Sequence, residues 1–140
     1  MEHQECVSFL LVKRGYALLE TRSRDKETDP GVITIPGGHM ESGETQLATL
    51  TRELTEELCI SPKHHFYLCS LYHPTAAELQ LIHYYVVTEW AGQLRNQEAE
   101  TVEWYPLNDA PVQLEADKVA LSEFVRIGGQ LSYEPAFFRR

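Results

Sequence analysis

The chain has 140 residues and a mass of 16.1 kDa, with 43% hydrophobic and 24% charged residues, which is typical of a folded globular protein. This length suits a single domain over residues 1–140, and the composition argues against disorder along the whole chain. The formal net charge is −9, so we expect neither nucleic acid nor an anionic membrane surface as a partner. No apolar run approaches the roughly 20 residues of a membrane helix.

The first residues lack a basic segment followed by an apolar stretch, so we expect no secretory signal and a cytoplasmic protein. The three cysteines are Cys6, Cys59 and Cys69. Their odd number and the absence of a CxxC spacing predict neither a disulfide framework nor a zinc knuckle. We expect them to be buried thiols in a reducing compartment.

The first third of the chain predicts strands and turns. Three apolar, β-favouring runs predict strands at residues 6–13, 16–21 and 32–35. Arg14 and Gly15 supply a turn between the first two, which predicts a hairpin. The polar segment 22–30 predicts an exposed loop, and the third strand should end at Pro36, because proline cannot continue a strand ladder.

A helical pattern follows, beginning near Ser42-Gly43-Glu44 and ending at Ser61-Pro62. Its leucines recur at spacings of three, four and four, which predicts a buried stripe of Leu47, Leu50, Leu54 and Leu58. Further strands are predicted at residues 66–72, 79–88 and 101–105, and a second helix at 114–127. Strands on both sides of one helix, with a late second helix, predict an α+β fold with a mixed sheet between helices.

Three glutamates share one face of the first helix, at Glu53, Glu56 and Glu57. Like charges at these spacings repel one another, and Arg52 offsets them only in part. Two interpretations remain open from these residues alone: a solvated acidic face, or a cation site. If a cation binds, ligands that are all oxygen favour Mg²⁺ or Mn²⁺ over Zn²⁺, and Gly37 and Gly38 can bring a backbone carbonyl close.

Residues 38–60, GHMESGETQLATLTRELTEELCI, resemble the signature box of the Nudix hydrolases. The positions that match are Gly38, Glu44, Arg52, Glu53, Leu54, Glu56, Glu57 and Ile60. Cys59 stands where the family has glycine, which allows a left-handed helix cap, so cysteine must adopt another geometry or accept strain. Of the two, we expect a changed turn. The chemistry should be intact, because Cys59 lies beyond the last acid. The resemblance implies the Nudix α/β/α sandwich with a central mixed sheet.

The resemblance also implies an activity, the metal-dependent hydrolysis of a nucleoside diphosphate linked to another group. Its implied metal ligands are Gly38, Glu53, Glu56, Glu57 and, from the loop before Trp104, Glu98 in preference to Glu100 or Glu103. The implied cofactor is Mg²⁺, with Mn²⁺ as a substitute. Glu53 or a neighbouring acid would be the general base, Arg52 would orient Glu53, and Glu44 would fix the junction of loop and helix.

For substrate binding, we expect contributions from Gly37, His39, Tyr84 and Glu100. His39 stands where some relatives carry lysine, so it either assists proton transfer or is an exposed loop residue. Asp117 and Asn108 are further candidates for contact with a base edge. The aromatic strand residues offer stacking surfaces, although most such residues belong to a core.

The short chain and the PGGHMESGET and WYPL segments are similar to MutT-like members, which favours a nucleoside triphosphate cleaved to monophosphate and pyrophosphate. Oxidised guanine nucleotides are one candidate substrate. ADP-ribose or another nucleotide sugar is the alternative, to which Pro74 points weakly. An isopentenyl diphosphate isomerase and a nucleotide sensor without activity are disfavoured, because the box is nearly complete. The terminal YEPAFFRR could pack on the sheet or on a second subunit, so a homodimer is a further expectation.

Overall fold

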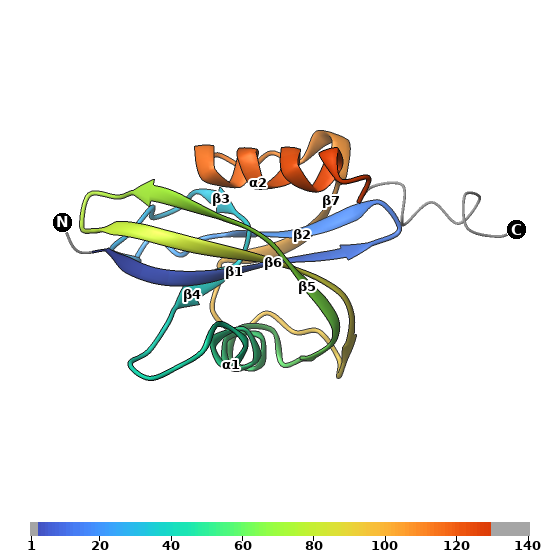
Figure 1. Cartoon of the computed structure of the whole chain (residues 1–140), viewed down its shortest axis with the longest axis horizontal. Coiled ribbons are helices and arrows are strands. Elements are labelled where there is room, and N and C mark those ends of the chain that lie inside the picture. Colours follow the sequence, from blue (N-terminus) through green and yellow to red (C-terminus); the bar gives the residue numbers. More distant parts are fainter. Residues whose placement is uncertain (1–2, 130–140) are drawn as a thin grey trace, which may run out of the picture.

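The computed structural model describes residues 3–129, which form a seven-stranded mixed sheet between two α-helices (Figure 1). The elements in chain order are β1 Gln4–Lys13, β2 Tyr16–Thr21, β3 Ile33–Thr34, β4 Gly37–His39, α1 Gln46–Leu58, β5 Ser61–Pro74, β6 Leu79–Ala91, β7 Thr101–Pro106, a 3-10 turn Leu107–Asp109, and α2 Glu115–Arg126. The α+β class and the α/β/α layers predicted from the sequence are confirmed. Neither helix within residues 3–129 is long and apolar enough to cross a membrane.

Strand β1 is the centre of the sheet, whose order is β3-β2-β1-β6-β5. It pairs in parallel with β6 along most of its length and antiparallel with β2 near its end, while β7 pairs with β2. Near its start, β1 also pairs antiparallel with β4, which sets Cys6 opposite His39 and Val7 opposite Gly38. The glycine corner of the signature box is therefore fixed against the central strand.

Strand β4 was not expected, because the third strand was predicted to end at Pro36. Pro36 lacks an N–H group, but its carbonyl accepts a hydrogen bond from the N–H of Phe9 at 2.8 Å, and pairing resumes one residue later. A Cβ atom on Gly37 would lie 2.4 Å from the carbonyl oxygen of Val7. Only glycine allows this close approach to β1.

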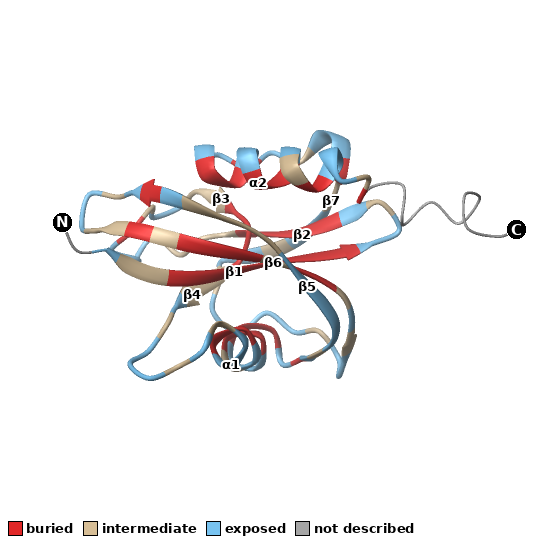
Figure 2. Ribbon diagram, viewed as in Figure 1, coloured by how far each residue is buried: buried red, intermediate tan, exposed pale blue. Residues whose placement is uncertain are grey.

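The two faces of the sheet carry two apolar cores, because successive side chains of β1 point to opposite sides. Val7, Phe9 and Leu11 pack with the buried side of α1, and Leu10 and Val12 belong to the core beneath α2. Figure 2 shows the buried side of each helix turned toward the sheet. This double burial holds both helices in fixed positions over the sheet.

Helix α1 buries a different face from the one its leucines predict. Leu47 is 49% exposed, whereas Thr49, Glu53 and Glu57 are buried. The buried face is therefore centred between the leucine stripe and the acids, so two glutamates lie inside it. An apolar pattern cannot reveal this, because buried carboxylates count as polar in it. Glu56 lies just outside this face and is exposed.

The end of α1 keeps the left-handed cap, so the changed turn expected at Cys59 is wrong. Cys59 adopts φ 60°, and its N–H donates to the carbonyl of Thr55 at 3.1 Å. At the other end of α1, the Thr45 hydroxyl accepts a hydrogen bond from the N–H of Ala48 at 3.1 Å. Cys59 is also exposed, so only Cys6 is a fully buried thiol, and Cys69 is half-buried.

Strand β5 begins at Ser61, earlier than predicted, and includes Pro62. It is an edge strand of the sheet, where a residue without an N–H group is tolerated. The predicted helix stop at Ser61-Pro62 is therefore correct, but a strand follows at once. The YEPAFFRR segment, for which a packing role was expected, lies outside the described residues.

Candidate active site

Three carboxylates meet beside the glycine corner: Glu53 and Glu57 from α1, and Glu98 from the loop before β7. One oxygen atom of each lies within 4.8 Å of the other two. The loop is held against α1 by backbone hydrogen bonds from Gln97 to Glu57 and from Arg95 to Leu58, both 2.9 Å long. We call Glu53, Glu57 and Glu98 the acid cluster.

The acid cluster is electrostatically unfavourable on its own. Glu53 and Glu57 are 8% and 5% exposed, and no hydrogen-bond partner from residues 3–129 reaches Oε2 of Glu57. Burial, followed by the charges of Glu20 and Glu53, holds the pKa of Glu57 far above its usual range. Burial also raises the pKa of Glu20, a neighbouring buried acid on β2. A bound cation would offset both effects.

The donor set of the acid cluster fits a hard divalent cation. All its donors are carboxylate oxygens, and the unsatisfied Oε2 atom of Glu57 is a free ligand position. Gly38 leaves the space that the cluster needs, because a Cβ atom there would lie 2.2 Å from Cδ of Glu53. Mg²⁺ and Mn²⁺ both suit such a site.

Arg52 joins the acid cluster to the loop before α1. Its Nη1 donates to Oε1 of Glu53 at 2.9 Å, its Nε to Oε2 of Glu44 at 2.7 Å, and its Nη2 to the backbone carbonyl of His39 at 2.9 Å. The hydrogen bond from Arg52 lowers the pKa of Glu44 to about 2. Glu44 also accepts from Thr49 and from the N–H of Glu41, both at 2.8 Å. Arg52 and Glu44 therefore lock the loop to the helix and fix one oxygen of Glu53.

A cavity of about 380 Å³ opens beside Glu53 and Glu98. Arg22 and Lys26 contribute positive charge to its wall, and Nζ of Lys26 lies 3.9 Å from a carboxylate oxygen of Glu98. Asp117 of α2 lines the same cavity. The volume is within the usual range for a small-molecule site.

Asp117 is nearly inaccessible, at 1% exposure, and both its oxygens accept hydrogen bonds. One bond comes from the N–H of Ile35 at 3.0 Å and the other from the hydroxyl of Tyr84 at 2.7 Å. Burial raises the pKa of Asp117 to about 6. The carboxylate is therefore held in one orientation at the wall of the cavity.

The structure brings together most of the residues expected at the site. The predicted residues that line the cavity are Gly37, Gly38, His39, Glu53, Glu98 and Asp117. Glu57 is in the acid cluster, whereas the half-exposed Glu56 lies against Arg52, with 3.2 Å between its Oε2 and Nη1. Arg52 and Glu44 are not among the residues that line the cavity: Arg52 contacts Glu53, and Glu44 contacts Arg52.

Two predicted substrate contacts are not brought to the cavity. Tyr84 is fully buried in the core beneath α2, and only its hydroxyl partner Asp117 lines the cavity. Glu100 lies 3.8 Å from Arg24 in an exposed ion pair, and its backbone N–H donates to Thr21. A strand pattern does not distinguish a core tyrosine from a wall tyrosine, because both occupy alternating positions.

Sequence reasoning missed several groups at the site. Glu20 lies two residues after Leu18 on β2, so both side chains point toward α1, and this spacing was a usable signal. Arg22 and Lys26 belong to the segment expected to be an exposed loop, and no local pattern indicates that it folds over the cavity. Cys6 and Glu78 also line the cavity.

Comparison with known proteins identifies the family to which this fold and site belong. The family model of the NUDIX domain matches residues 2–126. The Escherichia coli 8-oxo-dGTP diphosphatase is 32% identical over 75 residues, covering 54% of this chain and 58% of the relative. The Escherichia coli CTP pyrophosphohydrolase is 28% identical over 122 residues, covering 81% and 90%. A MutT NUDIX hydrolase from Burkholderia pseudomallei superimposes with a TM-score of 0.78 at 28% identity, covering 88% of this chain and 98% of that structure.

The chain belongs to the NUDIX domain family, because the family model matches nearly all of it. Its similarity is to the MutT type of this family. The enzyme class expected from the sequence, a hydrolase of phosphoric anhydride bonds, is confirmed by the family match and by the relatives.

Proposed function

We propose that this chain is a metal-dependent pyrophosphohydrolase that cleaves a nucleoside triphosphate to a monophosphate and pyrophosphate. The observation that carries the proposal is the acid cluster beside a cavity that also holds Arg22 and Lys26. Carboxylates alone repel a polyphosphate, so a cation between them and the substrate is required. Mg²⁺ bound there would neutralise phosphate charge and lower the pKa of a bound water.

Glu53, Glu57 and Glu98 would hold the cation, and the residues around them position the substrate. Arg22 and Lys26 line the same cavity, where they can contact phosphate oxygens. Gly37 and Gly38 line the same cavity, and Gly38 leaves the space that the Glu53 carboxylate occupies. Arg52 keeps Glu53 in a fixed orientation, which suits either of its possible roles, ligand or general base.

The triphosphate class is supported by the relatives. The two Escherichia coli proteins are named for 8-oxo-dGTP and CTP, both of which are nucleoside triphosphates. Their bases differ, so the base preference of this chain has to be measured. Asp117 lines the cavity, but both its oxygens already accept hydrogen bonds within the fold, so it does not by itself favour one base.

The test is a panel of 8-oxo-dGTP, dGTP, CTP and ADP-ribose with Mg²⁺, with products resolved by ion-exchange chromatography. The proposal predicts nucleoside monophosphate and pyrophosphate from a triphosphate, and loss of turnover by several orders of magnitude in Glu53→Gln. Glu115→Gln, an exposed acid on α2, is the matched control and should keep the rate. Cleavage of ADP-ribose alone would show that the substrates are nucleotide sugars and not nucleoside triphosphates. Binding without cleavage would show that the protein is a nucleotide sensor.

A further inference from the structure

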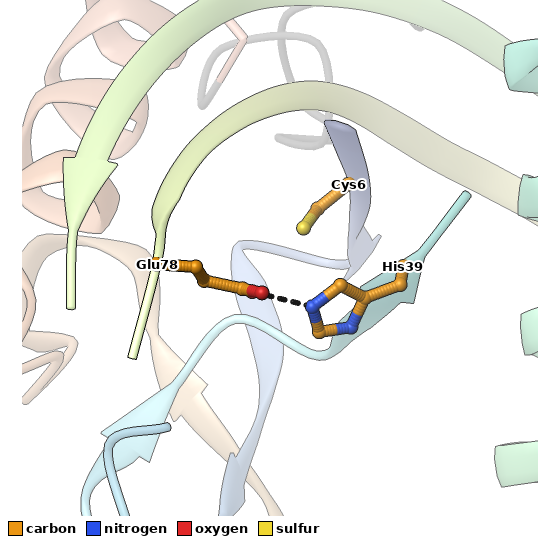
Figure 3. A group of neighbouring side chains, drawn as sticks. All are labelled: Cys6, His39 and Glu78. Atoms are coloured by element: carbon orange, nitrogen blue, oxygen red, sulfur yellow. Dashed lines mark hydrogen bonds and ion pairs between the residues drawn. The ribbon is translucent and has the colours of Figure 1, made fainter. Parts of the chain in front are cut away.

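Cys6, His39 and Glu78 form a second group of ligand side chains in the cavity, distinct from the acid cluster. One ligand atom of each lies within 4.8 Å of the other two. Figure 3 shows the three side chains pointing toward one another from β1, β4 and the segment before β6. The pairing of Cys6 with His39 across β1 and β4 sets two of them side by side.

Glu78 is held toward the other two by its own turn. The Thr75 hydroxyl accepts a hydrogen bond from the N–H of Glu78 at 2.9 Å, and the N–H of Thr75 donates to the carbonyl of Glu78 at 2.8 Å. Nε2 of Gln80 donates to Oε2 of Glu78 at 2.8 Å, and Nε2 of His39 lies 2.5 Å from the same oxygen. The group is therefore assembled without a metal and needs little rearrangement to bind one.

The donor set differs in kind from that of the acid cluster. A thiolate, an imidazole and a carboxylate are ligands that Zn²⁺ accepts, whereas Mg²⁺ prefers oxygen alone. Bonds of about 2.0–2.3 Å around a tetrahedral Zn²⁺ place ligand atoms roughly 3.3–3.8 Å apart. The His39–Glu78 separation of 2.5 Å is shorter than this, and Sγ of Cys6 lies within 4.8 Å of both, so modest side-chain rotations would reach the range. Three protein ligands leave a fourth position open toward the cavity.

We propose that Cys6, His39 and Glu78 bind Zn²⁺ in preference to Mg²⁺, and that Zn²⁺ bound there obstructs the cavity and inhibits the hydrolase. Binding of the metal replaces the thiol proton of Cys6, which is released to solvent. The inhibition rests on the proposed function, whereas the metal site does not. Mg²⁺ at the acid cluster and Zn²⁺ at this group would be held by separate ligands, so both can be present together.

The site is tested with Co²⁺ as a spectroscopic substitute for Zn²⁺, in buffer saturated with Mg²⁺. The parent protein is Cys59→Ser/Cys69→Ser, in which Cys6 is the remaining thiol. We expect a thiolate-to-cobalt charge-transfer band in the near ultraviolet that saturates at one equivalent and disappears when Zn²⁺ is added. Adding Cys6→Ser should abolish the band. Absence of the band in the parent, or its persistence after Cys6→Ser, would overturn the proposal.

His39→Gln and Glu78→Gln test the other two ligands and keep the experiment decisive if Cys6→Ser fails to fold. Each should weaken Co²⁺ binding in the parent by at least about 10- to 100-fold, the loss typical even of groups that only support a ligand. Asp25→Asn, which alters a carboxylate outside this group, should leave Co²⁺ affinity unchanged. Unchanged affinity in both His39→Gln and Glu78→Gln would contradict the site.

The inhibition is tested on the Mg²⁺-loaded enzyme with increasing Zn²⁺. The wild type should be inhibited at Zn²⁺ concentrations about tenfold or more below those needed for Cys6→Ser. Equal inhibition of both would show that Zn²⁺ acts at the acid cluster, and would overturn the inhibitory role. If the protein hydrolyses none of the nucleotides, the proposed function fails, while the cobalt spectrum still decides the metal site.

Discussion

Gly38 lies directly against the carboxylate of Glu53, so that a Cβ atom at position 38 would lie 2.2 Å from its Cδ. The two residues come from different elements, β4 and α1, and the pairing of β4 with β1 sets their approach. The glycine of the signature box therefore serves to admit a buried acid. Its backbone conformation is not left-handed, so space and not φ is what selects glycine here.

Gly38→Ala should lower the rate of hydrolysis about 100-fold. The added methyl group would displace the Glu53 carboxylate from its hydrogen bond with Arg52, and a shift of about 1 Å at a reacting centre has an effect of this size. Overpacking of this kind costs about 1–3 kcal/mol of stability. Gly43→Ala is the contrasting control, because φ is +83° at Gly43 and no atom lies within 4 Å of its Cβ position. It should cost about 1 kcal/mol of stability and keep the rate. An unchanged rate in Gly38→Ala together with a lowered rate in Gly43→Ala would contradict this account.

Arg52→Ala should reduce both activity and stability, because it removes the hydrogen bonds to Glu53, Glu44 and the carbonyl of His39. Hydrogen bonds to charged groups contribute about 1.5–3 kcal/mol each, so we expect a loss of at least about 2 kcal/mol in the free energy of unfolding. Arg52→Lys should recover only part of both losses, because an ammonium group cannot bridge three partners in one plane. Denaturant unfolding and steady-state kinetics measure the two effects. Full rescue by lysine would mean that charge alone matters.

Cys59→Gly should raise stability by about 0.5 kcal/mol without changing the rate. Cys59 holds φ 60°, which costs a residue with a Cβ atom about 1–2 kcal/mol, and the greater freedom of unfolded glycine offsets part of the gain. Cys59→Ala is the matched control, because it removes the sulfur that accepts a hydrogen bond from Gln97 but keeps the strain. The melting temperature of Cys59→Gly should be higher than that of Cys59→Ala. The reverse order would show that the cap is not strained.

Asp117 should make the protein less stable as pH rises. Burial raises its pKa in the folded protein from 3.8 to about 6, so the folded state binds more protons than the unfolded state between these values. Its contribution to stability is complete below pH 3.8 and is lost as pH rises to about 6. The difference corresponds to at most about 3 kcal/mol.

Asp117→Asn should flatten this part of the pH profile in urea unfolding. Tyr84→Phe removes the hydroxyl that stabilises the carboxylate, so it should move the loss of stability to higher pH. If the free energy of unfolding rises between pH 4 and 6 by the same amount in the wild type and in Asp117→Asn, other carboxylates account for that rise. A profile that changes in neither variant would refute the role of Asp117.

The sequence predicts strands and helices well wherever a continuous apolar run or a periodic apolar pattern exists, as in β1, β2 and α2. It predicts less well where backbone pairing is decided by distant residues. Gly37 to His39 pair with β1 as a strand, and Cys59 keeps a left-handed cap in which its N–H donates to the carbonyl of Thr55. Local propensity contains neither fact.

The candidate site shows the same division. Spacing places Glu53 and Glu57 on one helix face, but only tertiary packing buries them and leaves Glu56 outside. The resemblance to the family anticipates Glu98, which joins the cluster from 41 residues beyond Glu57 along the chain. Arg22, Lys26 and Glu78 reach the cavity from loops, which carry no periodic signal.

The central claim is that the acid cluster holds a divalent cation, and Mn²⁺ binding measured by electron paramagnetic resonance tests it most directly. The wild type should bind Mn²⁺ in competition with Mg²⁺, and Glu57→Gln should weaken binding by at least about 100-fold, because it removes a buried ligand. Glu89→Gln, at an exposed acid on β6, should bind like the wild type. Equal Mn²⁺ affinity in Glu57→Gln and the wild type, together with hydrolysis that persists under chelator, would contradict the account.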